Sequence, residues 1–137
     1  MNAYNALELA LHQRLETVVT TDLIKYPNII YDDSQETAIW VRPSLLYGSA
    51  ESATLGRDGL NFVRGVYQVS IFTARNTGTK PSNDYAKLIL DAFPKGDRLT
   101  FTGGVIMINV GYQSTNLLEE QFLHTPVTIP FTAHMEV

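Results

Sequence analysis

Three histidines are the first residues in this sequence that could hold a metal ion, because imidazole is a common metal ligand. His124 and His134 share the parity of one predicted strand, but at ~3.3 Å per residue they lie roughly 33 Å apart and cannot share an ion. His12 lies between Glu8 and Glu16 at helical spacing, which could form a carboxylate–imidazole site. A solvated helix face with i, i+4 pairs explains that spacing more simply, so no metal site is predicted.

Adjacent acidic residues could supply general acid–base chemistry, which needs two carboxylates in different environments facing one substrate. The pairs Asp32-Asp33 and Glu119-Glu120 occur in turn-like sequence, and neighbours on a strand point apart. We interpret both pairs as turn and surface residues.

Nucleophiles and phosphate-binding loops are also poorly supported. Ser49 and Ser52 lie among small residues, but no G-x-S-x-G context surrounds them. The glycines of this region have the wrong spacing for a phosphate loop, and no Gly-Lys-Ser/Thr follows them. The chain has no cysteine, which excludes disulfides, thiolate catalysis and cysteine-based metal centres. The sequence predicts no catalytic, cofactor-binding or metal-binding residue, and it argues against an enzyme.

Composition favours one domain over residues 1–137, since domains commonly contain ~100–200 residues. The net charge of −4 argues against a basic face that follows nucleic-acid phosphates. The basic residues that could cluster are more simply ion-pair partners at an interface: Arg57, Arg64, Arg75, Lys80 and Arg98. Charged residues make up 18% of the chain, below the usual ~25%, which indicates that partners cover part of the surface. No apolar stretch approaches the ~20 residues of a membrane span, and no signal-peptide pattern is present.

Two amphipathic helices are predicted. From Asn2, a suitable N-cap, to about Val19, apolar residues recur at three- and four-residue steps. The second helix ends at Phe93, before the stop signals Pro94 and Gly96. Its apolar stripe consists of Tyr85, Leu88, Ile89, Ala92 and Phe93.

Most of the remaining chain alternates in the manner of β-strands. The predicted strands span residues 39–46, 61–73, 98–101, 105–113 and 122–137. The last strand has Pro126 and Pro130 on its polar parity. Because proline is tolerated mainly at edges and bulges, we expect this strand to run along an edge of the sheet.

This order of elements predicts an α+β fold in two layers, with both helices on one face of an antiparallel or mixed sheet. The other face then keeps apolar residues at outward parity, namely Trp40, Leu46, Phe62, Val66 and Phe72. An exposed apolar face marks a protein–protein surface. The alternative is a parity misjudged across a bulge, which would return these side chains, Trp40 included, to the core. A glycine-rich connection at about 47–59 is predicted to be a long flexible loop with a functional role.

Several segments, spread over nearly the whole chain, together carry a family resemblance. In chain order they are Tyr26-Pro27-Asn28, Trp40-Val41-Arg42-Pro43, Ala53-Thr54-Leu55-Gly56, residues 65–71, the helix end at Phe93, Gly96-x-x-Leu99 and the strand from Pro126 to Ile129. In the order of its elements and in its length, the chain resembles the tail terminator, or tail completion, proteins of siphophages.

This resemblance implies a virion structural protein without cofactors and without a membrane partner. Tail terminators form a hexameric ring on the last ring of the tail tube and stop its polymerisation. They join the tail to the head-completion protein of the neck, and DNA passes through the central hole. The implied partners are five further copies of the chain, the major tail tube protein and the head-completion protein, assembled in the cytoplasm of the host bacterium. The loop at 47–59 would then order against the tube or a neighbouring subunit.

Seven residues are the candidate contacts with the tube or with neighbouring subunits: Trp40, Arg42, Leu46, Tyr47, Leu55, Arg57 and Arg64. Two other functions stay open. One is a different ring of the same virion, such as a neck or head-closure protein. The other is a small-molecule-binding α+β module, which would need a concave pocket with convergent polar groups.

Overall fold

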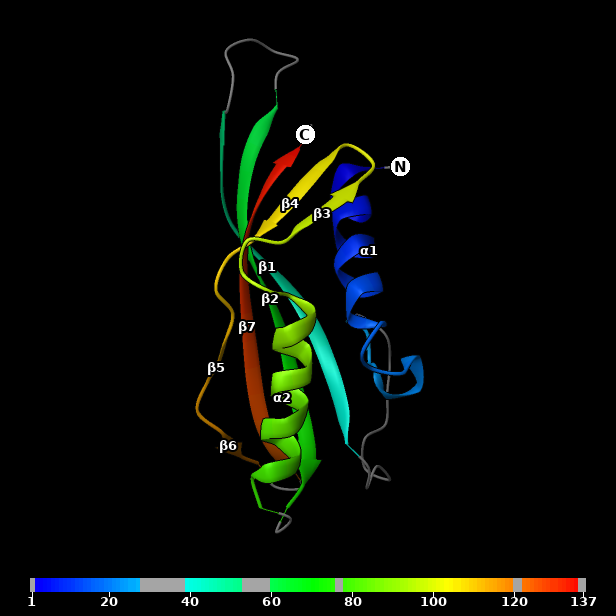
Figure 1. Cartoon of the computed structure of the whole chain (residues 1–137), viewed down its shortest axis with the longest axis vertical. Helices are drawn as coiled ribbons and strands as arrows, with labels where there is room; N and C mark the ends of the chain where they lie inside the picture. Colours follow the sequence, from blue (N-terminus) through cyan, green and yellow to red (C-terminus); the bar gives the residue numbers. More distant parts are fainter. Residues whose placement is uncertain (1, 28–38, 53–59, 76–77, 120–121, 136–137) are drawn as a thin grey trace.

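The computed structural model describes residues 2–27, 39–52, 60–75, 78–119 and 122–135. Within these ranges the chain forms two layers, with helices α1 and α2 packed on one face of an antiparallel sheet (Figure 1). The predicted α+β fold is therefore confirmed. Among the described residues, neither helix has the length and apolar character needed to cross a bilayer.

Helix α1 spans Ala3–Leu15, and the side chain of Asn2 caps it by accepting a hydrogen bond of 2.8 Å from the Tyr4 amide. The helix ends earlier than predicted. The Thr17 hydroxyl donates to the Arg14 carbonyl at 2.6 Å, and the Thr17 amide bonds the same oxygen at 3.1 Å. This tightened turn and the β-branched residues that follow oppose further α-helix.

Helix α2 spans Lys80–Ala92 and buries Ser82, Ala86 and Ile89 against the sheet. Leu88, predicted on the apolar stripe, is instead 43% exposed. The buried face of α2 is centred on Ala86, whose small side chain allows the helix to approach the strands closely.

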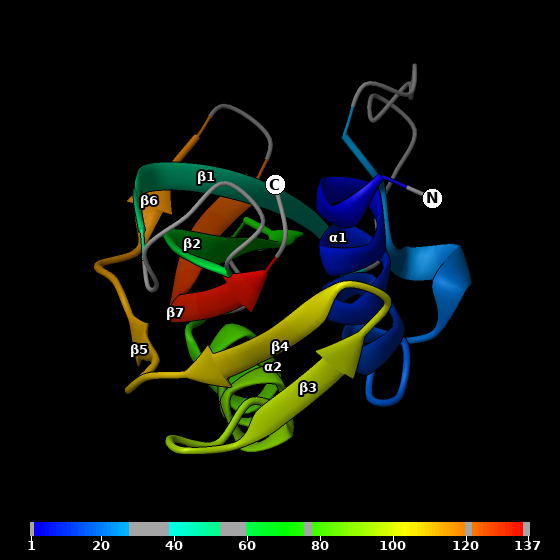
Figure 2. The ribbon, with the colours of Figure 1, turned by 90° about the horizontal axis from the view of Figure 1, so that it is seen from above.

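Three long strands build the sheet: β1 (Trp40–Ser52), β2 (Asn61–Ala74) and β7 (Phe122–Met135). With β3 (Arg98–Phe101) and β4 (Gly104–Ile108), their order is β1-β2-β7-β4-β3. Two short strands, β5 (Tyr112–Gln113) and β6 (Leu117–Leu118), pair with the first half of β7 (Figure 2). The main core fills the space between the sheet and the helices.

Strand β7 is central, so the prediction that it runs along an edge is wrong. It pairs with β2 on one side and with the separate strands β4, β5 and β6 on the other. Its two prolines direct their carbonyls to this second side, where Pro130 accepts from the Asn109 amide at 2.9 Å and Pro126 from the Ser114 amide at 2.8 Å. Because both donors lie just beyond short strands, the missing proline N–H groups interrupt no continuous ladder.

The predicted strand at 105–113 is divided in two. Strand β4 ends at Ile108, and the chain then leaves the ladder until Tyr112. Val110 and Tyr112, expected on the buried parity, are more than half exposed.

The predicted loop at 47–59 begins too early. Tyr47–Ser52 continues β1 and pairs with Asn61–Gly65 of β2 across a register shift at Gly48. Residues 53–59 lie outside the described residues. We call the described end of this hairpin, residues 46–52 and 60–64, the hairpin arm. The arm extends past the N-terminal end of α1 (Figure 1).

Candidate functional site

A small aromatic cluster lies on the sheet face that the helices leave uncovered. The rings of Trp40 and Phe72 stack at a centroid distance of 4.2 Å, and Phe122 meets Trp40 edge-on at 5.7 Å. Trp40 alternates along β1 with the core residue Val41, which places the cluster on the opposite side of the sheet from the main core. The outward parity predicted for Trp40 and Phe72 is therefore correct.

The expectation of an exposed Trp40 is wrong, because its side chain is 1% exposed. The indole stacks on Phe72 and meets Phe122 edge-on within the outer layer itself. Trp40 can therefore support this surface only as a buried side chain, while the exposed side chain of Arg42 faces solvent.

Arg42 and His124 border the aromatic cluster. The Arg42 guanidinium lies 5.2 Å from the centre of the Trp40 ring and 5.8 Å from that of Phe72, which is cation–π geometry. The His124 ring stacks on Phe72 at 4.6 Å. Burial lowers the pKa of His124, nearby Glu119 raises it, and the charge of Arg42 lowers it, with a net decrease. The imidazole is accordingly neutral at neutral pH, and the positive charge here belongs to Arg42.

The hairpin arm carries most of the other predicted contact residues. Leu46 is 55% exposed and Tyr47 is 44% exposed. Arg64 forms an exposed ion pair of 2.7 Å with Glu51 on the paired strand, which occupies its guanidinium within the arm. Candidate contacts Leu55 and Arg57 lie outside the described residues.

Tyr47 links the arm to the helical layer. Its ring meets the Tyr4 ring of α1 edge-on at a centroid distance of 5.0 Å. Burial, then the negative charge of Glu8 and the presence of Tyr4, raises the pKa of Tyr47 to about 12. The phenol therefore stays protonated and acts as an amphipathic contact group.

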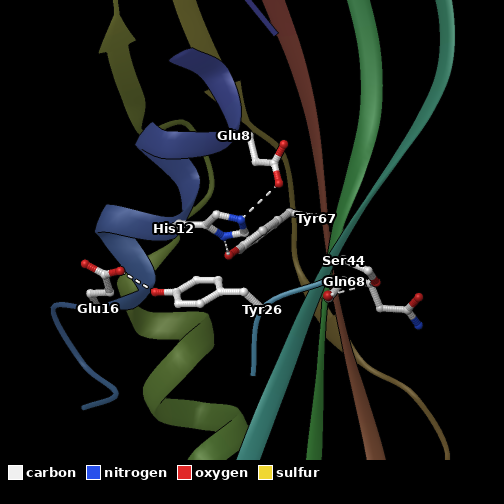
Figure 3. Close-up of polar contacts among 7 residues, drawn as sticks. All are labelled: Glu8, His12, Glu16, Tyr26, Ser44, Tyr67 and Gln68. Carbon is white, nitrogen blue, oxygen red and sulfur yellow. Dashed lines mark hydrogen bonds and ion pairs between the residues drawn. The ribbon is translucent and has the colours of Figure 1, made fainter. Parts of the chain in front are cut away.

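A second cluster, made of polar side chains, joins α1 to the sheet (Figure 3). The Nδ1 atom of His12 lies 2.7 Å from the hydroxyl of Tyr67, and its Nε2 lies 3.3 Å from Glu8. Nearby, the Tyr26 hydroxyl donates to Glu16, and the Tyr26 ring packs edge-on against His12 at 4.9 Å.

The expected i, i+4 pair of Glu8 with His12 is present, but the interpretation of His12 as part of a solvated helix face is wrong. Its side chain is 12% exposed and hydrogen-bonds a fully buried tyrosine of β2. One sequence signal could have found this contact. Tyr67 lies on the inner parity of β2, and a buried tyrosine hydroxyl requires a partner.

The Glu8–His12–Tyr67 chain has the residue types of an acid–imidazole–hydroxyl relay, but its geometry does not suit catalysis. Tyr67 is 0% exposed, and burial raises the pKa of its hydroxyl well above the usual value. A reactive group must reach substrate, and this hydroxyl is enclosed. Among the described residues, no group of three or more His, Cys, Asp or Glu side chains is placed to hold a metal ion. The cluster therefore fastens α1 to β2.

A surface groove of about 390 Å³ lies between α1 and α2, lined in part by Arg14, Leu88 and Asp91. Arg14 donates to Asp97 at 2.6 Å and to the Ala92 carbonyl at 2.9 Å, and Asp91 pairs with Lys87 at 3.0 Å. Its charged groups are thus engaged within the protein. The groove lacks the free convergent polar groups that a small-molecule site needs.

Comparisons with known proteins bear separately on the fold and on the family. A solved structure has the same fold, with a TM-score of 0.78 at 14% identity, covering 100% of this chain and 99% of the other. No curated protein matches. The model of the family described as "Phage tail terminator protein" matches residues 6–131 and so includes both helices and nearly the whole sheet. This chain therefore belongs to the phage tail terminator protein family, a family of structural proteins of the virion tail.

Proposed function

We propose that six copies of this chain form a ring that caps the tail tube, stops its polymerisation and joins the tail to the head–neck connector. The observation that supports this role is the match of the tail terminator family over residues 6–131. In this proposal the partners are the major tail tube protein and a head-completion protein. DNA passes through the ring without sequence-specific binding.

The surface chemistry fits an assembly subunit. The clusters built around His12 and Trp40 are occupied by contacts within the protein. Exposed apolar side chains gather instead on the hairpin arm and along residues 109–118, which follow the side of β7 away from β2. Surfaces of this kind are typical of protein–protein contact.

The first test is the mass of the purified protein by light scattering, with negative-stain images of the same peak. Six copies of the 15.3 kDa chain have a mass of about 92 kDa, and we expect annular particles of that mass. A stable dimer or tetramer would contradict the sixfold ring. A monomer would move the test to purified tail tubes, where the protein should bind tube ends and halt elongation. Tubes that lengthen equally with and without it would then refute the proposal.

Two finer proposals accompany the ring. Six copies at −4 each carry a formal charge of −24, and an acidic lumen would keep DNA from adhering. A ring structure with a basic lumen would contradict this.

The second finer proposal concerns residues 47–59, which we expect to contact the tube or a neighbouring subunit. Hydrogen exchange there should slow when tail tube is added, and unchanged exchange on capped tubes would refute that contact.

A further inference from the structure

Exposed large apolar side chains are unevenly distributed over the described surface. Nine are exposed, and seven of them form two groups. The first group lies on the hairpin arm and consists of Leu46, Tyr47 and Leu60. The second lies along residues 109–118, which we call the edge flank, and consists of Val110, Tyr112, Leu117 and Leu118. Only Leu9 and Leu88 stand apart, one on each helix.

The two groups lie in opposite halves of the molecule along its long axis (Figure 1), and in the strand pairing they belong to different sides of β7. The arm begins at the edge strand β1, where Leu46 aligns through Val66 with Pro130 of β7. The edge flank borders the far side of β7, where Leu118 aligns with Leu123. A contact between the two groups therefore cannot form within one copy.

Both surfaces are also poor in free charge, because the charged side chains of the hairpin arm, Glu51 and Arg64, pair with each other at 2.7 Å. Residues 105–118 contain no Asp, Glu, Lys, Arg or His, and neither do residues 43–50. The chain as a whole is 18% charged, so two such stretches are a marked local depletion. Charge depletion typifies the centre of a protein–protein interface, because burial there removes no ion from water.

We infer that the hairpin arm of one copy packs against the edge flank of the next copy. This inference rests on the proposed ring. A closed ring uses a heterologous interface, in which two different patches of the subunit meet. The arm and the edge flank are two such patches: both expose large apolar side chains, the flank has no charged residue, and the arm has one internal ion pair. The occupant of each is therefore a second copy of this chain.

The absence of cysteine makes a disulfide test specific. In Leu46→Cys/Leu118→Cys, the aligned positions on β7 are seven residues apart, or roughly 23 Å along the strand at ~3.3 Å per residue. A disulfide needs Cα atoms within ~7 Å, so only a bond between copies can form. We expect mild oxidation of the assembled particle to give a covalent ladder reaching six chains.

A matched control places the cysteines on the two isolated apolar residues, as Leu9→Cys/Leu88→Cys. Both positions are exposed to a similar degree, and we expect at least a tenfold lower yield of linked chains. Equal ladders from the two variants, or no ladder from the arm–flank pair, would overturn the inference. A ring that persists by light scattering in that case would leave the proposed function intact.

A second variant separates the interface from folding. Leu118→Asp introduces a charge at a side chain that is 66% exposed, so the fold of the subunit should tolerate it. We expect loss of the ring, on tubes or in solution, with an unchanged circular dichroism spectrum. A ring of unchanged mass would overturn the inference. Failure of the wild-type chain both to form rings and to cap tubes would instead refute the proposed function itself.

Discussion

Tyr67→Phe tests whether the buried polar contact between helix α1 and strand β2 stabilises the fold. The change removes one hydroxyl and keeps the ring in place, including its packing at 5.6 Å from Phe93. It deprives Nδ1 of His12 of a partner at 2.7 Å, in a side chain that is 12% exposed. A buried polar group left without its partner costs ~1–3 kcal/mol. Because His12 keeps its contact with Glu8, we expect a loss of about 2 kcal/mol in the free energy of unfolding.

The assay is urea unfolding followed by circular dichroism, with thermal melts as a second measurement. For a chain of this length, 2 kcal/mol corresponds to a decrease in Tm of roughly 6–10 °C. The matched control is Tyr112→Phe, which removes the same atom from a side chain that is 53% exposed. Its effect should stay within ~0.5 kcal/mol.

A double-mutant cycle completes the test. His12→Leu alone leaves the hydroxyl of Tyr67 buried without this partner, whereas the double variant removes both polar groups. Replacing both partners by apolar groups can be nearly neutral. The sum of the losses in unfolding free energy of the two single variants should therefore exceed the loss in the double variant by about 1–2 kcal/mol. Additivity within ~0.5 kcal/mol, or equal losses in Tyr67→Phe and Tyr112→Phe, would refute the reasoning.

Three further outcomes follow from the packing and the pKa shifts. Gly104→Ala would place a Cβ atom 2.1 Å from a backbone carbonyl of β7, so we expect a loss above ~3 kcal/mol in urea unfolding, whereas Gly48→Ala, with its nearest atom at 3.5 Å, should cost less than ~1 kcal/mol. The pKa of His124 is lowered in the folded protein, so the unfolded chain binds this proton more readily, and the free energy of unfolding should fall as pH drops through about 6.5. His124→Gln should flatten the pH dependence of unfolding between pH 7.5 and 5, and an unchanged slope would contradict this. Trp40→Ala removes the ring stacked on Phe72 and should cost ~3–5 kcal/mol in urea unfolding, and a loss below ~1 kcal/mol would show that the outer cluster contributes little.

Local patterns predicted several elements well. The alternation of β2 and β7 reports their inner faces, because side chains of a strand point to opposite sides in turn. The capping role of Asn2 and the stop after Phe93 depend only on neighbouring residues, and both are present. The four-residue strand 98–101 is likewise as predicted.

The candidate contacts were predictable in their parity and less so in their exposure. Leu46 and Tyr47 are exposed as expected of contact residues, whereas Trp40 is buried and packs against aromatic neighbours from β2 and β7. Alternation along one strand carries no information on what lies beside it. Contacts with a tube or a neighbouring subunit stay predictions for all seven residues.

The sequence by itself determined the two-layer α+β class, the inner faces of β2 and β7 and the absence of thiol chemistry, since these depend on composition and on periods of two and 3.6 residues. Only the tertiary structure decided that β7 lies at the centre, that β1 continues through Ser52, and that His12 reaches Tyr67 across 55 positions of sequence. Strand order and helix-to-sheet contacts join residues that are far apart in the chain. Such contacts arise from how whole faces pack together, and no local period encodes that choice.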